Sequence, residues 1–423
     1  MEEFKSNNVE LASFVVSVYV LGFAFGPMIL APLSEIYGRL VIYHSCNVGF
    51  VAFTVACALA TKLNMLIGFR FLAGCFGSAP LTNGGGSIAD LIHQQNRGKA
   101  MSAFVIGPIV GPVIGPIAGG YLSQAKGWRW VFWLLAMLSG VCTIFCFFFL
   151  RETHAPTLLS RKTARLQKET GNPELRSKLD SGLSPRDFFV RSIIRPAKML
   201  ILSPVVLSTS IFVGVVYGYL YLLFTTFTVV FEDTYGFSSG SVGLSFLGIG
   251  IGSVSGLLFF AWFSDRTLKR MTEQADAKAA AAGEESAGMK PEYRLPIMIP
   301  AAALIPVGFL IYGWTSKYHV HWIVPIMSTA LIGIGNIAVF MTVSTYLVDV
   351  FTIYAASALA ANTVIRSIMG AVLPLTGQKM YETLGLGWGN SLLAFVAIAL
   401  LPVPIILLKW GERIHKRFAL KNL

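Results

Sequence analysis

Charged residues are scarce in this sequence. Only 13% of its 423 residues are Asp, Glu, Lys or Arg, whereas 55% are hydrophobic. A soluble domain carries about a quarter charged residues, so the composition excludes an ordinary soluble protein. Cysteine is equally sparse, and its five copies all lie in apolar stretches without metal-ligand spacing: Cys46, Cys57, Cys75, Cys142 and Cys146. We expect buried reduced thiols and no disulfide framework.

The motifs of common enzyme classes are missing or misplaced. No Gly-Lys-Ser/Thr phosphate loop occurs, which leaves ATP-driven chemistry unsupported. The six histidines are scattered, with His319 and His321 as the only close pair. Residues Gly236–Gly240 match G-x-S-x-G, but they link two apolar stretches instead of a strand and a helix. We therefore expect no enzymatic activity, no cofactor and no metal.

What the sequence has in abundance is apolar stretches, each close to the ~20 residues that cross a bilayer. Their number and spacing predict an all-α polytopic membrane protein with eleven spans. The expected spans are Leu11–Leu33, Leu40–Ala60, Met65–Ile92, Ala100–Leu122, Trp130–Leu150, Ser203–Phe231, Ser241–Phe263, Leu295–Trp314, His321–Thr345, Tyr354–Thr376 and Asn390–Leu408.

The positive charge is concentrated in two segments. Arg151–Pro204 carries a net charge of +6 and Lys409–Leu423 a net charge of +4, out of +12 for the whole chain. Such clustering marks cytoplasmic segments of membrane proteins and does not indicate nucleic-acid binding. We expect an N-terminal bundle (residues 1–150), a basic cytoplasmic central loop (151–202), a C-terminal bundle (203–409) and a basic cytoplasmic tail (410–423).

One stretch, GPIVGPVIGPIAGG, repeats glycine at every fourth residue with proline one place behind. Its small and cyclic residues are Gly107, Pro108, Gly111, Pro112, Gly115, Pro116, Gly119 and Gly120. Proline and glycine weaken a helix in water, but neighbouring helices compensate inside a bilayer. Glycines four apart form a flat stripe that lets a second backbone approach. Ordinary glycine-zipper packing and a dedicated functional motif are both consistent with this spacing.

An internal repeat divides the chain into two halves. The first span ends in Ser34–Arg39 (SEIYGR) and the seventh in Ser264–Arg266 (SDR), while Asp90 and Asp349 close the third and ninth spans. A duplicated helical unit places acids at corresponding helix ends in this way.

Taken together, these motifs resemble the major facilitator superfamily, specifically the twelve-span drug:proton antiporters of fungi that export toxins, drugs and polyamines. The segments that carry the resemblance are Ala31–Arg39, Arg70–Gly74, Gly111–Gly120, Gly127–Trp130, Glu152–Pro156, Tyr346–Asp349 and Ala356–Ser367. The resemblance implies two helical bundles with alternating access, and Gly107–Gly120 as the antiporter motif of helix five. The sequence differs from the family's pattern at Ala31 and Leu40. Its first span aligns with helix two of the family, so helix one of the family has no counterpart here.

The same resemblance implies a gate. We expect Glu35, Arg39 and Asp90 to meet at the cytoplasmic surface, with Gly38 permitting the tight turn between the first two spans. An arginine held by two carboxylates would lock the inward-closed arrangement. Asp265 and Asp349 would act in the second half. The alternative is that these charges only decorate the helix ends.

Several polar residues inside apolar stretches are candidates for a substrate cavity. A charge there is costly unless it faces a cavity or a partner, which applies to Arg70 and Arg366; snorkelling to the interface is the alternative. Asn83 and Asn336 are further candidates, with helix–helix hydrogen bonding as the competing role. Tyr217, Tyr221 and Phe224 share one helical face that suits flat apolar substrates or packing against a neighbour.

These features predict a secondary transporter in the plasma membrane that exports a hydrophobic or amphipathic organic compound, such as a drug or toxin, by proton antiport. Its expected partners are the small organic substrate, protons and the lipid bilayer, with no nucleic acid, and we expect a monomer. No acid lies deep in a span, which disfavours a polycation as substrate and leaves the proton-coupling group unassigned. The alternatives are a polyamine or nutrient permease, or a truncated protein that does not transport.

Overall fold

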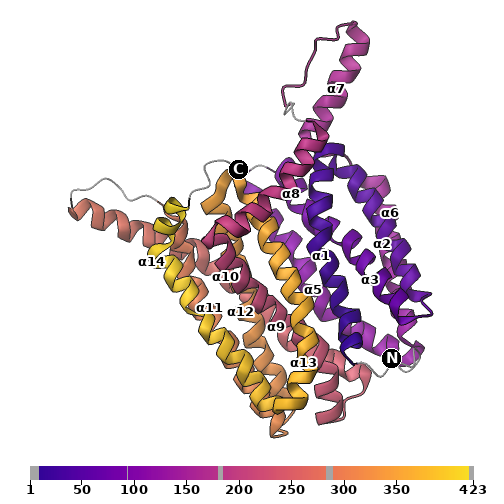
Figure 1. Ribbon diagram of the computed structural model, residues 1–423, viewed down its shortest axis with the longest axis vertical. Helices are drawn as coiled ribbons and strands as arrows, with labels where there is room; N and C mark the ends of the chain where they lie inside the picture. The colour runs from indigo at the N-terminus through magenta and orange to yellow at the C-terminus, as the bar shows by residue number, and fades with distance from the viewer. Residues whose placement is uncertain (1–8, 93, 180–183, 283–288, 419–423) are drawn as a thin grey trace. The chain divides into compact units, whose positions relative to one another are not determined.

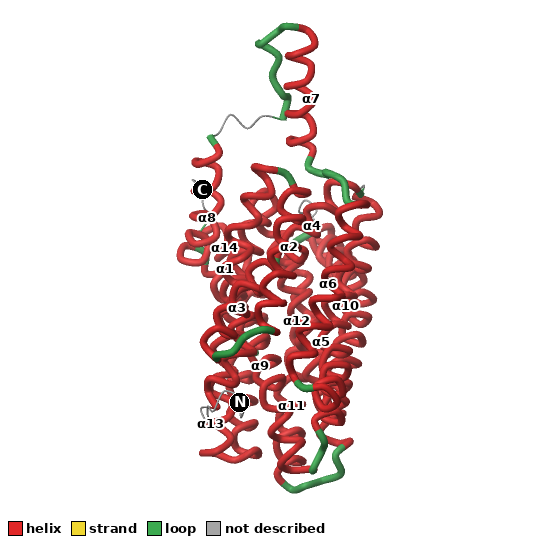
Figure 2. Tube along the Cα trace, turned by 90° about the vertical axis from the view of Figure 1, so that its right-hand side faces the viewer, coloured by secondary structure: helices red, strands yellow, loops and turns green. Residues whose placement is uncertain are grey.

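The computed structural model describes residues 9–92, 94–179, 184–282 and 289–418, and every regular element within them is a helix (Figure 1, Figure 2). The elements, in chain order, are α1 (Val9–Tyr37), α2 (Arg39–Ala58), α3 (Leu63–Gly77), α4 (Ala79–Leu91), α5 (Gln94–Lys126), α6 (Trp128–Phe149), α7 (Ala155–Thr170), α8 (Pro185–Leu202), α9 (Pro204–Tyr235), α10 (Ser239–Ala282), η2 (Pro291–Ile297), α11 (Met298–Lys317), α12 (Ile323–Phe351), η3 (Thr352–Tyr354), α13 (Ala355–Leu400) and α14 (Pro402–Arg417).

Ten helical segments of the described chain are long and apolar enough to cross a membrane. The last of them, Ala355–His415, is 61 residues long and contains both of the final expected spans. It bends at Gly385, whose φ of 71° and ψ of 171° are not helical. The eleven expected spans thus correspond to ten segments, because the chain passes from the tenth span to the eleventh through a kinked helix without an intervening loop.

The chain divides into two compact units. The first contains Val18–Pro108 and Lys126–Arg195, and the second contains Asn7–Ser17, Ile109–Ala125 and Pro196–Leu423. The main apolar core of the second unit is formed by side chains of α9, α11, α12 and α13, among them the fully buried Phe227 and Phe309.

In the first unit, glycines bring α1 and α3 into close backbone contact. A Cβ atom at Gly22 would lie 2.6 Å from the backbone nitrogen of Cys75, and one at Gly26 would lie 2.6 Å from the Cys75 carbonyl oxygen. Gly74 on α3 contributes to the same contact, because a Cβ atom there would collide with the Tyr19 carbonyl oxygen on α1. This is small-residue packing of the kind that joins helices in a membrane.

In the second unit, the same principle joins α10 to α12. Gly248, Gly252 and Gly256 recur every fourth residue of α10, and each faces the backbone of α12 at Ile326, Ala330 and Ile334 respectively. On α9, Gly214 faces the side chain of Met369 on α13. Two glycine-lined contacts therefore hold the core helices of this unit together.

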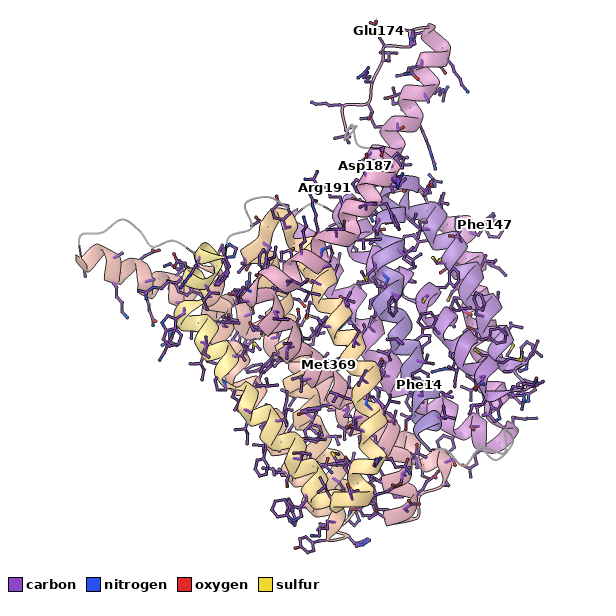
Figure 3. All side chains as sticks on the ribbon, in the orientation of Figure 1. Phe14, Phe147, Glu174, Asp187, Arg191 and Met369 are labelled. Atoms are coloured by element: carbon purple, nitrogen blue, oxygen red, sulfur yellow. The ribbon has the colours of Figure 1, made fainter. Side chains whose placement is uncertain are left out.

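Helix α6 presents its apolar side chains outward. Phe147 and Phe148 are 66% and 75% exposed, and Val141 and Ile144 are exposed as well (Figure 3). In water such a face would be a liability, whereas in a bilayer it contacts lipid without cost.

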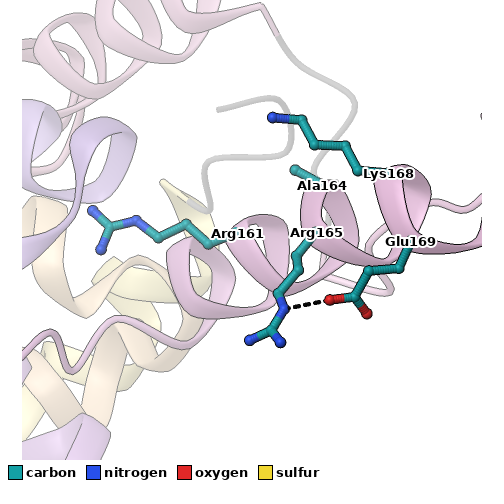
Figure 4. Close-up of a pocket in the computed structure, with 5 residues that line it drawn as sticks. All are labelled: Arg161, Ala164, Arg165, Lys168 and Glu169. Carbon is teal, nitrogen blue, oxygen red and sulfur yellow. Dashed lines mark hydrogen bonds and ion pairs between the residues drawn. The ribbon is translucent and has the colours of Figure 1, made fainter.

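The expected central loop is largely helical. Helix α7 ends at Gly171, which adopts the left-handed conformation (φ 69°), and α8 leads into α9 through Ser203. Arg161, Ala164, Arg165, Lys168 and Glu169 line a shallow depression on α7 (Figure 4). Arg165 pairs with Glu169 at 2.6 Å, but both side chains are largely exposed, so the pair contributes little to stability.

The alanine-rich segment after the seventh span is also helical up to its end in the described chain. Helix α10 continues without interruption from the membrane span through Ala277 to Ala282. The strong helix propensity of alanine accounts for this extension.

Candidate functional site

Arg39 is the centre of a polar cluster at one end of the first unit. It is the first residue of α2, and its Nη1 atom donates a hydrogen bond to Ser34 Oγ on α1 at 2.6 Å. Its Nε atom lies 3.5 Å from Asp90 Oδ2 on α4, as an ion pair. A Cβ atom at Gly86 would lie 2.8 Å from the Arg39 Nη2 atom, so the missing side chain makes room for the guanidinium against α4.

Glu152 anchors the same cluster, a role that sequence reasoning did not assign to it. Its Oε1 atom accepts the backbone N–H of Arg39 at 3.0 Å, and its Oε2 atom accepts that of Leu40 at 3.2 Å. The N–H groups of Thr153 and His154 donate to Oε1, each at 3.0 Å. A carboxylate here satisfies the free N–H groups at the start of α2 and interacts favourably with the helix dipole.

These contacts change the ionisation of Glu152. Burial alone would raise the pKa of the carboxyl, but the backbone N–H donors of His154, Arg39, Leu40 and Thr153 outweigh burial, and the pKa is lowered. The turn also depends on Gly38, which has a φ of 99° and no space for a Cβ atom beside the Glu152 carboxylate. Glu152 is therefore charged at neutral pH and locks the α1–α2 turn.

Glu35 does not take the position expected for it. The residue is exposed, and among the described contacts no ion pair joins it to Arg39. It points from the last turn of α1 into solvent, since Ser34, its neighbour, takes the inward position. The second carboxylate beside Arg39 is that of Glu152. It accepts hydrogen bonds from the backbone at the start of α2, whereas Asp90 pairs with the Arg39 guanidinium.

The second unit contains a matching cluster around Arg294 of η2. The Arg294 Nε atom lies 2.5 Å from Asp349 Oδ2 on α12. Its Nη1 atom lies 3.3 Å from Asp265 Oδ1 and 3.2 Å from Ser264 Oγ, both on α10. Arg294, which was not predicted, thus joins Asp265 and Asp349, the two acids proposed for the second half.

The 3₁₀-helix η2 that carries Arg294 is itself fastened to α14. Lys290 Nζ lies 2.6 Å from Glu412 Oε2, and this hydrogen bond raises the pKa of Lys290. The side chain of Glu292 is buried on the same element. The segment that carries Arg294 is therefore fixed on two sides, to α10 and α12 through Arg294 and to α14 through Lys290.

Arg70 lies among aromatic rings of the first unit. Its guanidinium carbon is 5.3 Å from the centre of the Tyr19 ring on α1 and 5.6 Å from that of Phe132 on α6. Each such contact is worth about 0.5–2 kcal/mol, depending on how dry the site is. The half-buried charge thus sits between three helices.

Asn83 on α4 is fully buried, and neither polar atom of its amide has a hydrogen-bond partner in the described structure. Asn336 on α12 is different, because its Nδ2 atom donates to the Val216 carbonyl on α9 at 3.1 Å. Asn336 therefore makes the helix–helix hydrogen bond that was its alternative role, while Asn83 makes none.

The expected aromatic face of α9 exists and is continuous. The ring centres of Tyr217 and Tyr221 are 5.0 Å apart, those of Tyr221 and Phe224 are 5.5 Å apart, and Phe224 contacts Phe246 of α10 at 5.4 Å. Arg366 on α13 places its guanidinium carbon 4.7 Å from the centre of the Tyr217 ring. Four of the predicted cavity residues thus share one surface of the second unit.

The Gly–Pro stretch forms an uninterrupted helix, despite Pro108, Pro112 and Pro116. Around the positions that Cβ atoms would take at Gly107, Gly111 and Gly115, no described atom of another element lies within 4 Å. The contacts of α5 with α10 use other residues, such as Val113 against Gly250 and Pro116 against Gly243. The stripe is therefore open at Gly107, Gly111 and Gly115. The Val113 side chain and the Pro116 carbonyl lie against glycines of α10, and Gly120 lies against the Ser239 backbone.

Comparison with known proteins decides what these clusters belong to. The sequence model of the Major Facilitator Superfamily matches residues 1–374 of the chain. The chain belongs to this superfamily.

Individual relatives of this major facilitator are also transporters. It is 58% identical to the MFS-type transporter tndD of Aspergillus flavipes, over 99% of this chain and 77% of that protein. It is 53% identical to the efflux pump radE of Floropilus chiversii, over 100% of this chain and 77% of that protein. Among solved structures, the xylose transporter XylE of Escherichia coli aligns with a TM-score of 0.66 and 16% identity, covering 96% of this chain and 90% of that one, which shows a shared fold.

The superfamily and its relatives make this protein a multi-pass membrane transporter for small molecules, not an enzyme. The structure accounts for the one enzyme-like motif. Gly236 ends α9 in the left-handed conformation (φ 66°), and Ser239 begins α10. The G-x-S-x-G match is thus a connection between two helices of the major facilitator.

The clusters around Arg39 and Arg294 are alike, and each lies within one of the two units. Ser34, Arg39 and Asp90 correspond to Ser264, Arg294 and Asp349 in residue type and in contact. Only the spacing hid the second arginine, because the long C-terminal extension of α10 separates it from Ser264. The serine–acid repeat was the available signal, and a search for a missing arginine near Asp349 could have found it.

Proposed function

We propose that this major facilitator exports a hydrophobic or amphipathic organic compound across the plasma membrane in exchange for protons. Alternating access of an N-terminal bundle (residues 1–150) and a C-terminal bundle (203–409) moves the compound, and the basic tail lies in the cytoplasm. The aromatic surface of Tyr217, Tyr221 and Phe224 carries the proposal, because a row of half-buried rings inside membrane helices suits flat apolar ligands.

Two further observations support export over import and over a polycation. A relative that is 53% identical over the whole chain is named as an efflux pump. A cation, Arg366, contacts the Tyr217 ring of the candidate surface. A polyamine would meet repulsion there, whereas an apolar or acidic compound would not.

The two arginine clusters supply the gate in this proposal. In each, a serine, an arginine and an aspartate from separate helices are joined at one helix end. Breaking the Arg39–Asp90 pair or the Arg294–Asp349 pair would release the helix ends that it joins, which is the opening step of this proposal.

The function is tested by efflux from yeast that lacks its own drug pumps. Cells producing this protein are loaded with the neutral dye Nile red, and export is followed with and without a protonophore. We expect export that stops when the proton gradient is removed. Dye retention equal to that of empty-vector cells, with the protein present at the surface, would contradict export of apolar compounds, and export insensitive to the protonophore would contradict proton antiport.

A further inference from the structure

Arg366 is a buried cation without a counter-charge. The residue is only 8% exposed and lies in the tenth expected span. Within the described residues it forms no ion pair, and its Nε atom has no hydrogen-bond partner. A guanidinium offers five N–H donors and cannot lose its charge, so this arrangement leaves a strong demand for an acceptor unmet.

Aromatic rings hold the guanidinium in place. Its central carbon lies 4.7 Å from the centre of the Tyr217 ring on α9 and 4.9 Å from that of Phe340 on α12. These ring faces stabilise the cation but accept no conventional hydrogen bond from its edge. The group is therefore positioned by packing while its N–H donors stay available.

A second polar group close by is also unsatisfied. Asn362 lies one helical turn before Arg366 on α13, is only 2% exposed, and its Oδ1 atom has no partner among the described residues. Residues four apart lie on the same side of a helix. Buried polar atoms are nearly always hydrogen-bonded in folded proteins, so the Arg366 Nε donor calls for an acceptor on a ligand, while the Asn362 Oδ1 acceptor calls for a separate donor such as a hydroxyl group of the same ligand.

We propose that Arg366 forms a carboxylate-binding subsite, so that the protein prefers acidic aromatic compounds to neutral ones of the same shape. The guanidinium would bind the carboxylate in a two-pronged contact, and the ring system would lie along Tyr217, Tyr221 and Phe224. The apolar side chains around the guanidinium lower the local dielectric constant, which strengthens such a charge pair. This subsite rests on the proposed function, and it defines the class of substrate that the protein would export.

A matched pair of ligands tests the subsite. The full-length protein in nanodiscs is titrated calorimetrically at pH 7 with 2-naphthoate and with methyl 2-naphthoate, and the heats from empty nanodiscs are subtracted. We expect the acid to bind about tenfold more tightly, which corresponds to about 1.4 kcal/mol. R366Q should bring the ratio of the two affinities close to one while binding of the ester persists.

Two further variants separate charge recognition from structure. R366K keeps the charge but loses the two-pronged geometry, so its preference should be intermediate. K379Q removes an exposed charge from the same helix and should leave the ratio unchanged. A ratio near one in the wild type, or a preference that survives R366Q, would overturn the subsite.

If R366Q fails to reach the membrane, a wild-type ratio near one still overturns the subsite, and the intermediate ratio expected of R366K then assigns the preference to Arg366. Failure of the subsite differs from failure of the proposed function. Export of Nile red with no preference for 2-naphthoate would leave the exporter intact and remove the subsite. Arg366-dependent binding of 2-naphthoate without any export would leave the subsite intact and remove the proposed export function.

Discussion

At the scale of single residues, Glu152 shows how a carboxylate outside the membrane determines a turn within the fold. Four backbone N–H groups converge on it, two of them from the start of α2. A single water molecule could not accept all four of these hydrogen bonds in place of the carboxylate. The Glu152 side chain and the turn at Gly38 therefore depend on each other. Residue types at the helix ends alone did not reveal this, since Glu152 is 113 residues away from Arg39 in sequence.

We therefore predict that E152Q lowers the stability of the protein by about 1–3 kcal/mol at pH 7, the usual cost of losing charge-assisted bonds to buried donors. The folded-state pKa of Glu152 is depressed, so its contribution is present above the ordinary carboxyl pKa and disappears as the pH falls through the lowered value. Thermal unfolding in detergent between pH 3 and pH 7 measures both effects.

E169Q provides the control for this prediction, because Glu169 belongs to an exposed pair on α7. The gap in melting temperature between wild type and E152Q should narrow at the acid end, whereas E169Q should follow the wild type throughout. An E152Q protein as stable as wild type at pH 7 would show that the carboxylate is dispensable.

Arg39 carries a separate prediction, on transport instead of stability. R39A removes both the ion pair to Asp90 and the bond to Ser34, while the Glu152 contacts to the backbone of α2 remain. We expect loss of dye export with normal amounts of protein at the cell surface. R165A on α7 is the matched control and should export normally; unchanged export in R39A would remove Arg39 from the gate.

Sequence reasoning was strongest where local pattern sufficed and weakest where contacts were distant. The Arg39–Asp90 pair follows from two motifs that lie on neighbouring helix ends, and the structure shows it. Arg294 was missed because 29 residues separate it from Asp265, including the solvated end of α10. Glu35 was expected to face Arg39, but the helix phase gives that position to Ser34.

At the scale of elements, two glycine stripes with the same spacing have opposite surroundings. On α10, a Cβ atom at Gly252 would collide with the backbone of Ala330. On α5, a Cβ atom at Gly111 would meet no other element in the described structure. Periodicity left both close packing and a dedicated functional motif open for the α5 stripe, whereas the same period on α10 marks a close contact. Spacing alone does not say which helix lies opposite.

This contrast gives a paired prediction. G252A should destabilise the protein, because the α12 backbone cannot move aside cheaply, whereas G111A should leave the melting temperature unchanged or raise it slightly through better helix propensity. If the α5 stripe is the antiporter motif, G111A should still reduce dye export. Equal melting temperatures for the two variants would show that the α10–α12 contact is not tight.

The membrane spans themselves were readily predictable, since each is a long apolar stretch. The positions where helices divide or join were harder to predict. The third expected span divides at Ser78 into α3 and α4, and the final two join into α13 through Gly385. A glycine or a serine at a break looks no different in sequence from one inside a helix, and only packing decides.

At the scale of the whole molecule, duplication organises the chemistry. Each half has a serine–arginine–aspartate cluster, and each half has an arginine enclosed by two aromatic rings: Arg70 with Tyr19 and Phe132, and Arg366 with Tyr217 and Phe340. The halves differ in the neighbourhood of these charges. Glu152 reinforces the first cluster and the Lys290–Glu412 pair reinforces the second.

If alternating access moves the two bundles as one mechanism, the two clusters must open together. R39A and R294A should then each abolish most export, and the double variant should be little worse than either alone, because the second change removes a contact already made useless. Independent clusters would instead give effects that multiply. Export rates of the four proteins, normalised to surface amount, form a double-mutant cycle that distinguishes these cases; multiplied losses would show that each cluster serves its own half and that closure requires no joint action.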